Sequence, residues 1–209
     1  LKNQGYDVIS MSVGEPDFPT PQNIKDAGIR AIEKNFTKYT QASGIPELKK
    51  AVVERFKQDM GLDYEPDQVI ISSGAKSSLF HLLEAIVNRG DEVIVPAPYW
   101  VTYPQAVKLA QGIPIIVSCR EEDEFKLTPE KLKSVISPST RVLILNNPNN
   151  PTGTVYSKHE LEEIADIVLE EDLLVIADEI YEKLVYDDAR FTSFASLGPD
   201  IKKRTIIIN

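Results

Sequence analysis

Residues 173–182, LLVIADEIYE, constrain the fold more than any other part of the chain. Five apolar or small residues in a row run directly into two carboxylates and a tyrosine. A run this short is typical of a central strand that helices cover on both faces, rather than of a buried helix. Asp178 would then stand at the carboxyl end of that strand, where open α/β sheets bind their ligands. Position alone leaves two readings open, a functional carboxylate or an edge residue in solvent.

From Gln68 onward, strand and helix patterns alternate. Ser157 and Glu160 have the spacing of a capping box, and Thr128 before Pro129 marks another helix start. Alternation of this kind predicts an α/β fold with a mostly parallel sheet and helices on both faces. Strands are predicted at residues 69–72, 92–96, 113–117, 141–145, 173–177 and 205–208, and helices at residues 76–87, 101–110, 129–136 and 158–170.

The N-terminal part predicts a short strand at residues 8–13 and two helices. Thr20 and Pro21 have the order of an N-cap and a first-turn proline, so the first helix is expected to follow them. The second helix is expected at residues 46–60, where apolar side chains recur on one face.

Composition narrows the class of protein. A chain of 209 residues that is 42% hydrophobic can bury a sizeable core. The net charge of −9 argues against nucleic acid or an anionic membrane as the main partner. Cys119 is the only cysteine, no apolar run approaches the ~20 residues of a membrane span, and the N-terminus lacks a signal-peptide layout. These features predict a cytoplasmic protein. The leucine start and the abrupt end at TIIIN suggest a piece of a longer chain.

Polar groups follow several predicted strands. IISSGAKSS, residues 70–78, places a glycine turn and Lys76 at a helix start, where free N–H groups and the helix dipole favour a phosphate. A plain turn with an exposed lysine is the alternative. PAPYW could present Trp100 to a flat ligand or to the core. The four asparagines of NNPNNPTG could bind a ligand or satisfy their own turn. Asp178 could accept from a ring N–H, with the Tyr181 phenol three residues on. Together these groups suit a flat heteroaromatic ring that carries a phosphate.

These motifs resemble those of the class I and II aminotransferases, fold-type I pyridoxal-phosphate enzymes, in the branch of prokaryotic aspartate aminotransferases. The resemblance covers essentially the whole chain. Its most specific part is NNPTG followed by DEIY at this separation. It is carried by GEPDF, KYTQASGIPELK, ISSGAKSSL, PAPYW, NNPNNPTG and ADEIYE.

The resemblance implies a role for each matching residue. The cofactor phosphate would be held by Gly74, Ala75 and Lys76, and Trp100 would stack on the ring. Asp178 would pair with the ring nitrogen and keep it protonated, which makes the ring an electron sink. Asn150 and Tyr181 would hydrogen-bond the ring oxygen. The substrate would be bound by Gly14, Trp100 and Asn150. Tyr39 would reach the phosphate of the neighbouring subunit in a homodimer.

One departure concerns catalysis. The family's Schiff-base lysine follows the strand predicted at residues 205–208, so it would lie beyond Asn209, and no lysine in the chain matches that motif.

The resemblance also implies two parts, with residues 1–35 contributing to a smaller domain and residues 36–209 forming a large cofactor-binding domain, incomplete at its C-terminal end. The expected activity is transfer of an amino group from an L-amino acid, best aspartate, to a 2-oxo acid such as 2-oxoglutarate. The chain alone is expected to be inactive. Two alternatives stay open. One is a nucleotide-dependent oxidoreductase, although no G-x-G-x-x-G occurs in the sequence, and the other is a non-catalytic binding fragment.

Overall fold

The computed structural model describes residues 2–9, 14 and 18–209. It divides into two compact units, Leu1–Gln41 and Ala42–Asn209. The predicted strand at residues 8–13 lies largely outside the described residues, and residues 8 and 9 have no regular secondary structure. The assignment of residues 1–35 to a smaller domain stays a prediction.

The N-terminal unit contains a short 3₁₀ turn, η1 (Lys2–Gln4), and the helix α1 (Gln22–Glu33). The N-cap of α1 is Pro21, which has extended backbone angles, and no side chain caps the helix. The expectation that Thr20 is the cap was therefore wrong, because the helix begins one residue later than its pattern suggested. No residue of α1 is buried.

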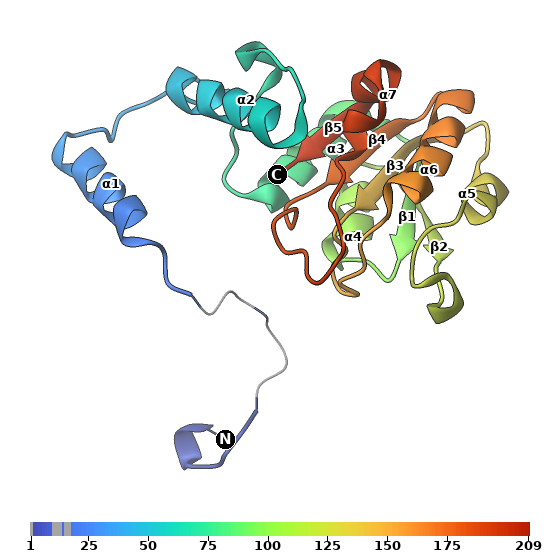
Figure 1. Ribbon diagram of the computed structural model, residues 1–209, viewed down its shortest axis with the longest axis horizontal. Helices are drawn as coiled ribbons and strands as arrows, with labels where there is room; N and C mark the ends of the chain where they lie inside the picture. The colour runs from blue at the N-terminus through green and yellow to red at the C-terminus, as the bar shows by residue number, and fades with distance from the viewer. Residues whose placement is uncertain (1, 10–13, 15–17) are drawn as a thin grey trace. The chain divides into compact units, whose positions relative to one another are not determined.

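The second unit is built on a five-stranded parallel sheet in the order β2-β1-β3-β4-β5 (Figure 1). This confirms the predicted parallel architecture and five of the six strands predicted from Gln68 onward. In the register of β3 against β4, Asn146 stands beside Asp178, so the polar ends of the two strands coincide. The strands are β1 (Glu92–Ala97), β2 (Ile113–Ser118), β3 (Thr140–Asn146), β4 (Leu174–Asp178) and β5 (Thr205–Ile208).

The strand predicted at residues 69–72 does not form. The segment follows a 3₁₀ turn, η2 (Pro66–Gln68), and the Ile71 N–H donates to the carbonyl oxygen of Ser43, 3.0 Å away, in a loop. A β-branched run forms a strand only beside a neighbour that completes a ladder. Within the part of the chain that the structure describes, residues 69–72 have no such neighbour.

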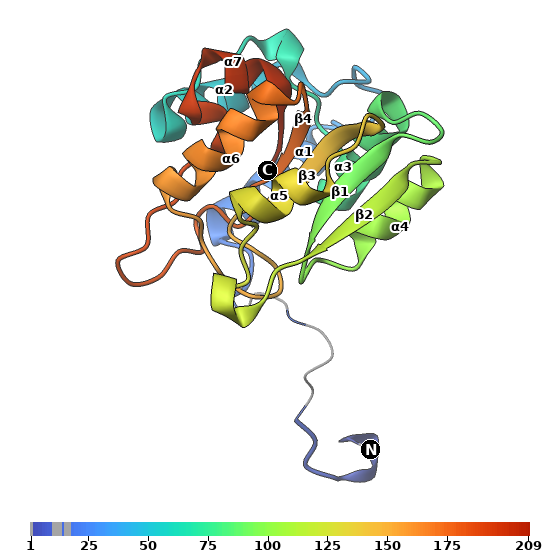
Figure 2. The ribbon, with the colours of Figure 1, turned by 90° about the vertical axis from the view of Figure 1, so that its right-hand side faces the viewer.

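Helices cover both faces of the sheet, as predicted, and successive strand residues point to opposite faces (Figure 2). Val142 and Ile144 of β3 join the core beneath α3 (Ala75–Ile86) and α4 (Thr102–Leu109). Leu143 and Leu145 join the core beneath three other helices. These are α5 (Pro129–Val135), α6 (Lys158–Glu170) and α7 (Pro199–Arg204).

The remaining elements of this unit are one long helix and short turns. The helix α2 (Pro46–Met60) has the predicted bounds. Helix α7 and the 3₁₀ turns η3 (Glu121–Asp123) and η4 (Phe194–Leu197) were not predicted, because such short elements carry too little periodicity. The caps at Thr128 and Ser157 both form, the latter as a complete capping box.

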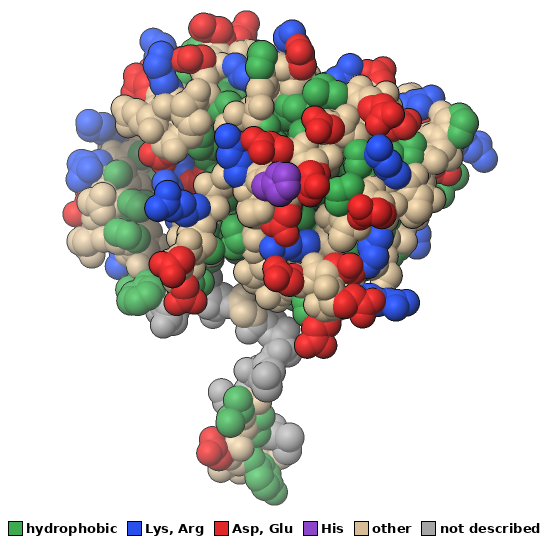
Figure 3. All heavy atoms as spheres, turned by 45° about the vertical axis from the view of Figure 1, so that its right-hand side comes forward, with side chains coloured by type: hydrophobic (Ala, Val, Ile, Leu, Met, Phe, Trp, Pro, Cys, Tyr) green, Lys and Arg blue, Asp and Glu red, His purple; other side chains and the backbone are tan. Residues whose placement is uncertain are grey.

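The described part of the chain contains no helix that is both long and apolar enough to span a bilayer. On the face shown in Figure 3, acidic and basic side chains are interspersed rather than separated into regions of one sign.

Candidate functional site

The candidate site lies at the carboxyl edge of the sheet. Asp178 ends β4, Asn146 beside it ends β3, and β1 ends at Ala97, three residues before Trp100. Because all five strands are parallel, these ends meet at one edge, where open α/β sheets place their ligands.

Asp178 is the most constrained group of the site. Its side chain is almost fully buried, with 4% of the residue exposed. The Tyr103 hydroxyl donates to Oδ2 at 2.6 Å, and the Ile180 backbone N–H donates to Oδ1 at 3.3 Å. Burial raises the pKa of Asp178, and these two donors oppose the rise. Among the described residues, no lysine, arginine or histidine forms an ion pair with this carboxylate.

The asparagines after β3 divide into two groups. Asn146 donates from Nδ2 to the Asp178 carbonyl oxygen at 2.9 Å, and its Oδ1 accepts from the Asn150 N–H at 2.7 Å. Asn147 Oδ1 and Asn149 Oδ1 also accept backbone N–H groups of the same turn. The side-chain amide of Asn150 makes no hydrogen bond to any described residue and is half-buried. Three amides therefore hold the turn, and the fourth is available to a ligand.

The Gly74–Lys76 segment forms the start of α3. Gly74 has φ +84°, a conformation that favours glycine, and it serves as the N-cap without any side-chain hydrogen bond to the helix end. The first N–H groups of a helix have no partner within the helix, so this end can receive an anion. Lys76 lies beside it, with Nζ 5.1 Å from the centroid of the Trp100 ring.

The sequence left two environments open for Trp100, the protein core and a surface facing a ligand, and its side chain is partly in each. It is half-buried and packs against the core cluster beneath α3 and α4. Its ring meets that of Tyr103 edge to face, with centroids 5.7 Å apart and planes at 84°.

Recorded contacts connect the predicted residues into one cluster. They run from Lys76 to Trp100, from Trp100 to Tyr103 and on to Asp178. Asn146 continues the series from Asp178 to Asn150. Residues far apart in sequence thus converge on one edge of one sheet, as the sequence predicted.

Gly74 and Ala75 adjoin Lys76 in the chain but make none of these contacts, and Tyr181, Tyr39 and Gly14 also lie outside them. Tyr181 occupies the turn directly after β4, at residues 180–183. Tyr39 and Gly14 belong to the N-terminal unit and are both exposed. Their roles toward cofactor, substrate and a second subunit stay predictions.

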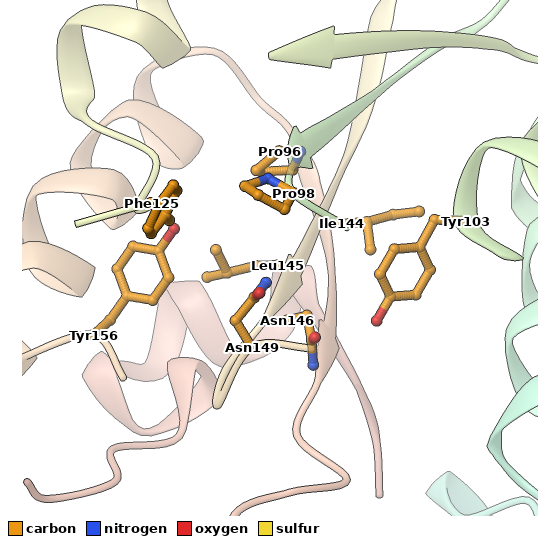
Figure 4. Close-up of a pocket in the computed structure, with 9 residues that line it drawn as sticks. All are labelled: Pro96, Pro98, Tyr103, Phe125, Ile144, Leu145, Asn146, Asn149 and Tyr156. Carbon is orange, nitrogen blue, oxygen red and sulfur yellow. The ribbon is translucent and has the colours of Figure 1, made fainter. Parts of the chain in front are cut away.

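A small recess opens beside the cluster, between the ends of β1 and β3 (Figure 4). It has room for about one water molecule, so it is too small for an aromatic ring. A ring would have to bind outside it, near Trp100. The recess is lined by Pro96, Pro98, Tyr103, Phe125, Ile144, Leu145, Asn146, Asn149 and Tyr156.

Tyr103 is the residue that sequence reasoning missed. It is 3% exposed, and burial followed by the neighbouring Asp178 charge raises its pKa, so its phenol is a hydrogen-bond donor. A usable signal was present: Tyr103 follows Trp100 by only three positions, and the Tyr103 N–H donates to the Trp100 carbonyl oxygen at 3.0 Å where the chain enters α4. Its partner, 75 positions away, carried no local signal.

Glu179 points away from this cluster, as alternation along an extended chain predicts. Its Oε1 accepts from the Ser193 hydroxyl at 3.1 Å and from the Phe194 N–H at 2.8 Å. Burial raises its pKa to about 7. It therefore fastens a loop to the opposite side of the sheet.

Comparison with known proteins places the chain among enzymes of one family. The model of the family described as aminotransferase class I and II matches residues 6–209. An aspartate aminotransferase of Bacillus sp. (strain YM-2) is 49% identical over 209 residues, which are 100% of this chain and 53% of that protein. A probable aspartate/prephenate aminotransferase of Rickettsia bellii is 46% identical over 210 residues, covering 100% of this chain and 53% of that protein.

Solved structures give the same result. The aspartate aminotransferase from Thermus thermophilus with maleate has a TM-score of 0.93 and 41% identity, covering 99% of this chain and 53% of its own. The aromatic aminotransferase from Pyrococcus horikoshii OT3 has a TM-score of 0.93 and 44% identity, covering 96% and 54%. The chain spans about half the length of the relatives it matches.

Proposed function

Because the chain belongs to the class I and II aminotransferase family, we propose that it forms the pyridoxal-phosphate-binding part of a transaminase. The reaction would move an amino group from an L-amino acid to a 2-oxo acid. Aspartate and 2-oxoglutarate are the proposed pair, because relatives named aspartate aminotransferase are 46% to 49% identical to this chain.

The observation that carries the proposal is the environment of Asp178. A buried carboxylate is costly unless a cation or several donors compensate its charge. Asp178 has two donors and, within the described residues, no cation. A ligand with a protonated ring nitrogen would supply that cation, and the raised pKa of Asp178 would fall when it binds.

The other groups of the cluster match the rest of such a ligand. The uncapped start of α3 at Gly74 and Ala75, with the Lys76 ammonium, would hold the phosphate. Trp100 would cover one face of the ring, and the Asn150 amide and Tyr181 phenol would donate to its oxygen. Members of this family use pyridoxal phosphate, which when bound supplies a ring that accepts electrons from the substrate α-carbon.

We further propose that the 209-residue chain does not complete the reaction. Catalysis in the family needs a lysine that bonds the cofactor and moves a proton. Lys76 is assigned to the phosphate and Lys183 follows β4 in the chain, whereas Lys202 and Lys203 lie in α7, before β5 begins, at the amino edge of the sheet. Lys183 pairs with Asp59 at 2.8 Å, and Lys203 pairs with Asp200 at 2.9 Å. Lys202 lies over the Tyr64 ring, 4.3 Å from its centroid.

Binding of the cofactor is tested by titrating the purified chain with pyridoxal phosphate and, separately, with NADH. Trp100 is the only tryptophan, so its fluorescence reports on this site alone. We expect pyridoxal phosphate to quench it saturably and NADH to leave it unchanged. Quenching by NADH in place of pyridoxal phosphate would favour the oxidoreductase alternative, which nothing in the comparisons supports.

The incomplete-site proposal is tested by borohydride reduction and peptide mass analysis. We expect no stoichiometric cofactor adduct at a single lysine of the 209-residue chain, and no amino transfer from aspartate. A stoichiometric adduct at one lysine, together with turnover, would contradict it.

A further inference from the structure

We propose that Tyr103 is a positioning residue, whose phenol fixes the carboxylate of Asp178 in the orientation in which it receives a ring N–H. This inference rests on the proposed function and adds to it a residue that the family resemblance did not supply.

The geometry makes Tyr103 a rigid support. Its ring belongs to the core beneath α3 and α4, together with Ala106 and Val107 of its own helix. Trp100 packs edge to face against it, so the phenol has little room to rotate away. Its Oη is 2.6 Å from Asp178 Oδ2, shorter than the usual neutral hydrogen bond and typical of one to an ionised acceptor.

The other donor to Asp178 is weaker. The Ile180 N–H reaches Oδ1 at 3.3 Å, near the limit for a hydrogen bond. Oδ2 is thus held by a short side-chain bond, and Oδ1 retains acceptor capacity for a ligand. A second consequence is electrostatic, because a donor to the ionised form lowers a carboxyl pKa and here opposes the effect of burial.

Few charges act on this carboxylate. Tyr103 faces it from α4, and Glu179 lies next to it in sequence and points to the opposite side of the sheet. Tyr181 follows in the turn, and β3 contributes the neutral amide of Asn146. On α3, Lys76 lies against Trp100 rather than in an ion pair with Asp178. The ionisation of Asp178 is therefore expected to depend on Tyr103 more than on any other side chain.

The test compares the chain with its Tyr103→Phe variant, which removes one oxygen and keeps the ring. The first measurement is the pH titration of the Asp178 carboxyl carbon by NMR in cofactor-free protein, assigned with Asp178→Asn. We expect the midpoint to rise by about one pH unit, because the ionised form loses a charge-assisted donor. The second measurement is the dissociation constant for pyridoxal phosphate at neutral pH, which we expect to rise roughly tenfold.

Tyr156→Phe is the matched control. Tyr156 is also a buried tyrosine, at 4% exposure, and its hydroxyl accepts from the Leu127 N–H at 2.7 Å. Its removal should cost stability but leave both the Asp178 midpoint and the dissociation constant unchanged. In an Asp178→Asn background, Tyr103→Phe should no longer weaken cofactor binding.

A third variant covers the case in which Tyr103→Phe does not fold. Incorporation of 3-fluorotyrosine at position 103 keeps the ring and makes the phenol a stronger donor, so the midpoint should fall instead of rise. An unchanged midpoint in both variants, or a shifted midpoint with unchanged cofactor affinity, would overturn the proposal. If no variant and no wild-type protein binds pyridoxal phosphate, the proposed function fails, and the NMR titration still decides whether Tyr103 controls Asp178.

Discussion

The two faces of the sheet differ in what their buried carboxylates do. Asp178 and Glu179 are neighbours in sequence and are both nearly inaccessible to solvent. Asp178 is bonded by Tyr103 on the face covered by α3 and α4. Glu179 is bonded by Ser193 and by the backbone of Phe194, which belongs to the core beneath α5, α6 and α7.

The two carboxylates therefore differ in their surroundings: Asp178 lies in the candidate ligand site, and Glu179 holds a loop against the sheet. The face under α3 and α4 carries Lys76, Trp100 and Tyr103, so its carboxylate belongs to a cluster with unused donors. On the other face, Glu179 ties a loop to the sheet, and its Oε2 is buried without a partner among the described residues. An uncompensated oxygen of this kind explains why burial raises the Glu179 pKa so far.

The largest expected effect comes from replacing one buried leucine on each face of the sheet by alanine. Leu83 of α3 and Leu161 of α6 both have 0% exposure. Either change to alanine should lower the free energy of unfolding by about 2–5 kcal/mol, measured by urea denaturation. Only Leu83→Ala should also weaken binding of pyridoxal phosphate, because Leu83 anchors the helix whose first turn is proposed to hold the phosphate. Equal weakening by Leu161→Ala would remove the functional distinction between the faces.

The next effect is the pH dependence caused by Glu179. Its pKa is about 7 in the folded chain against an ordinary value of 4.5, so the folded state binds the proton more tightly. Stability from this group is complete below pH 4.5 and is lost as the pH rises through 7, by about 3 kcal/mol in total. Glu179→Gln should abolish that part of the decline in urea-denaturation curves. Glu54→Gln, at an exposed position, should keep it.

The third effect tests the opposite face. Asp178→Asn should weaken the binding of pyridoxal phosphate at neutral pH by roughly tenfold to a hundredfold, because the ring N–H loses its charged acceptor. The stability of the cofactor-free variant should not fall, since a buried charge is removed. Fluorescence titration measures the affinity. Glu179→Gln serves as the comparison and should bind the cofactor as the wild type does.

The smallest effect concerns a helix start on the face away from the cluster. Ser157 accepts from the Glu160 N–H and caps α6, so Ser157→Ala should cost about 1 kcal/mol of stability. Thr20→Ala should cost nothing measurable, because Thr20 does not cap α1. Thermal unfolding would compare the stabilities of the two variants. A similar loss of stability in both would show that Thr20 caps α1 after all, as its sequence suggested.

Much of this arrangement was predictable where the signal is local. Apolar runs identified β1 to β5, and the residues after three of them identified the candidate cluster. The segment 69–72 has the same β-branched character and forms no strand, because strand formation depends on a neighbour that the local sequence does not specify.

The amino-acid sequence by itself determined the strand-and-helix alternation, the cap at Ser157, and the placement of Asp178 at a strand end and of Trp100 and Asn150 after strands. Only the tertiary structure decided that Tyr103 would meet Asp178, that three asparagines would hold their own turn, and that Glu179 would accept from Ser193 and Phe194. The reason is physical. Secondary structure follows from periodicity along a few residues, whereas hydrogen bonds and pKa shifts depend on distance and burial among residues far apart in the chain.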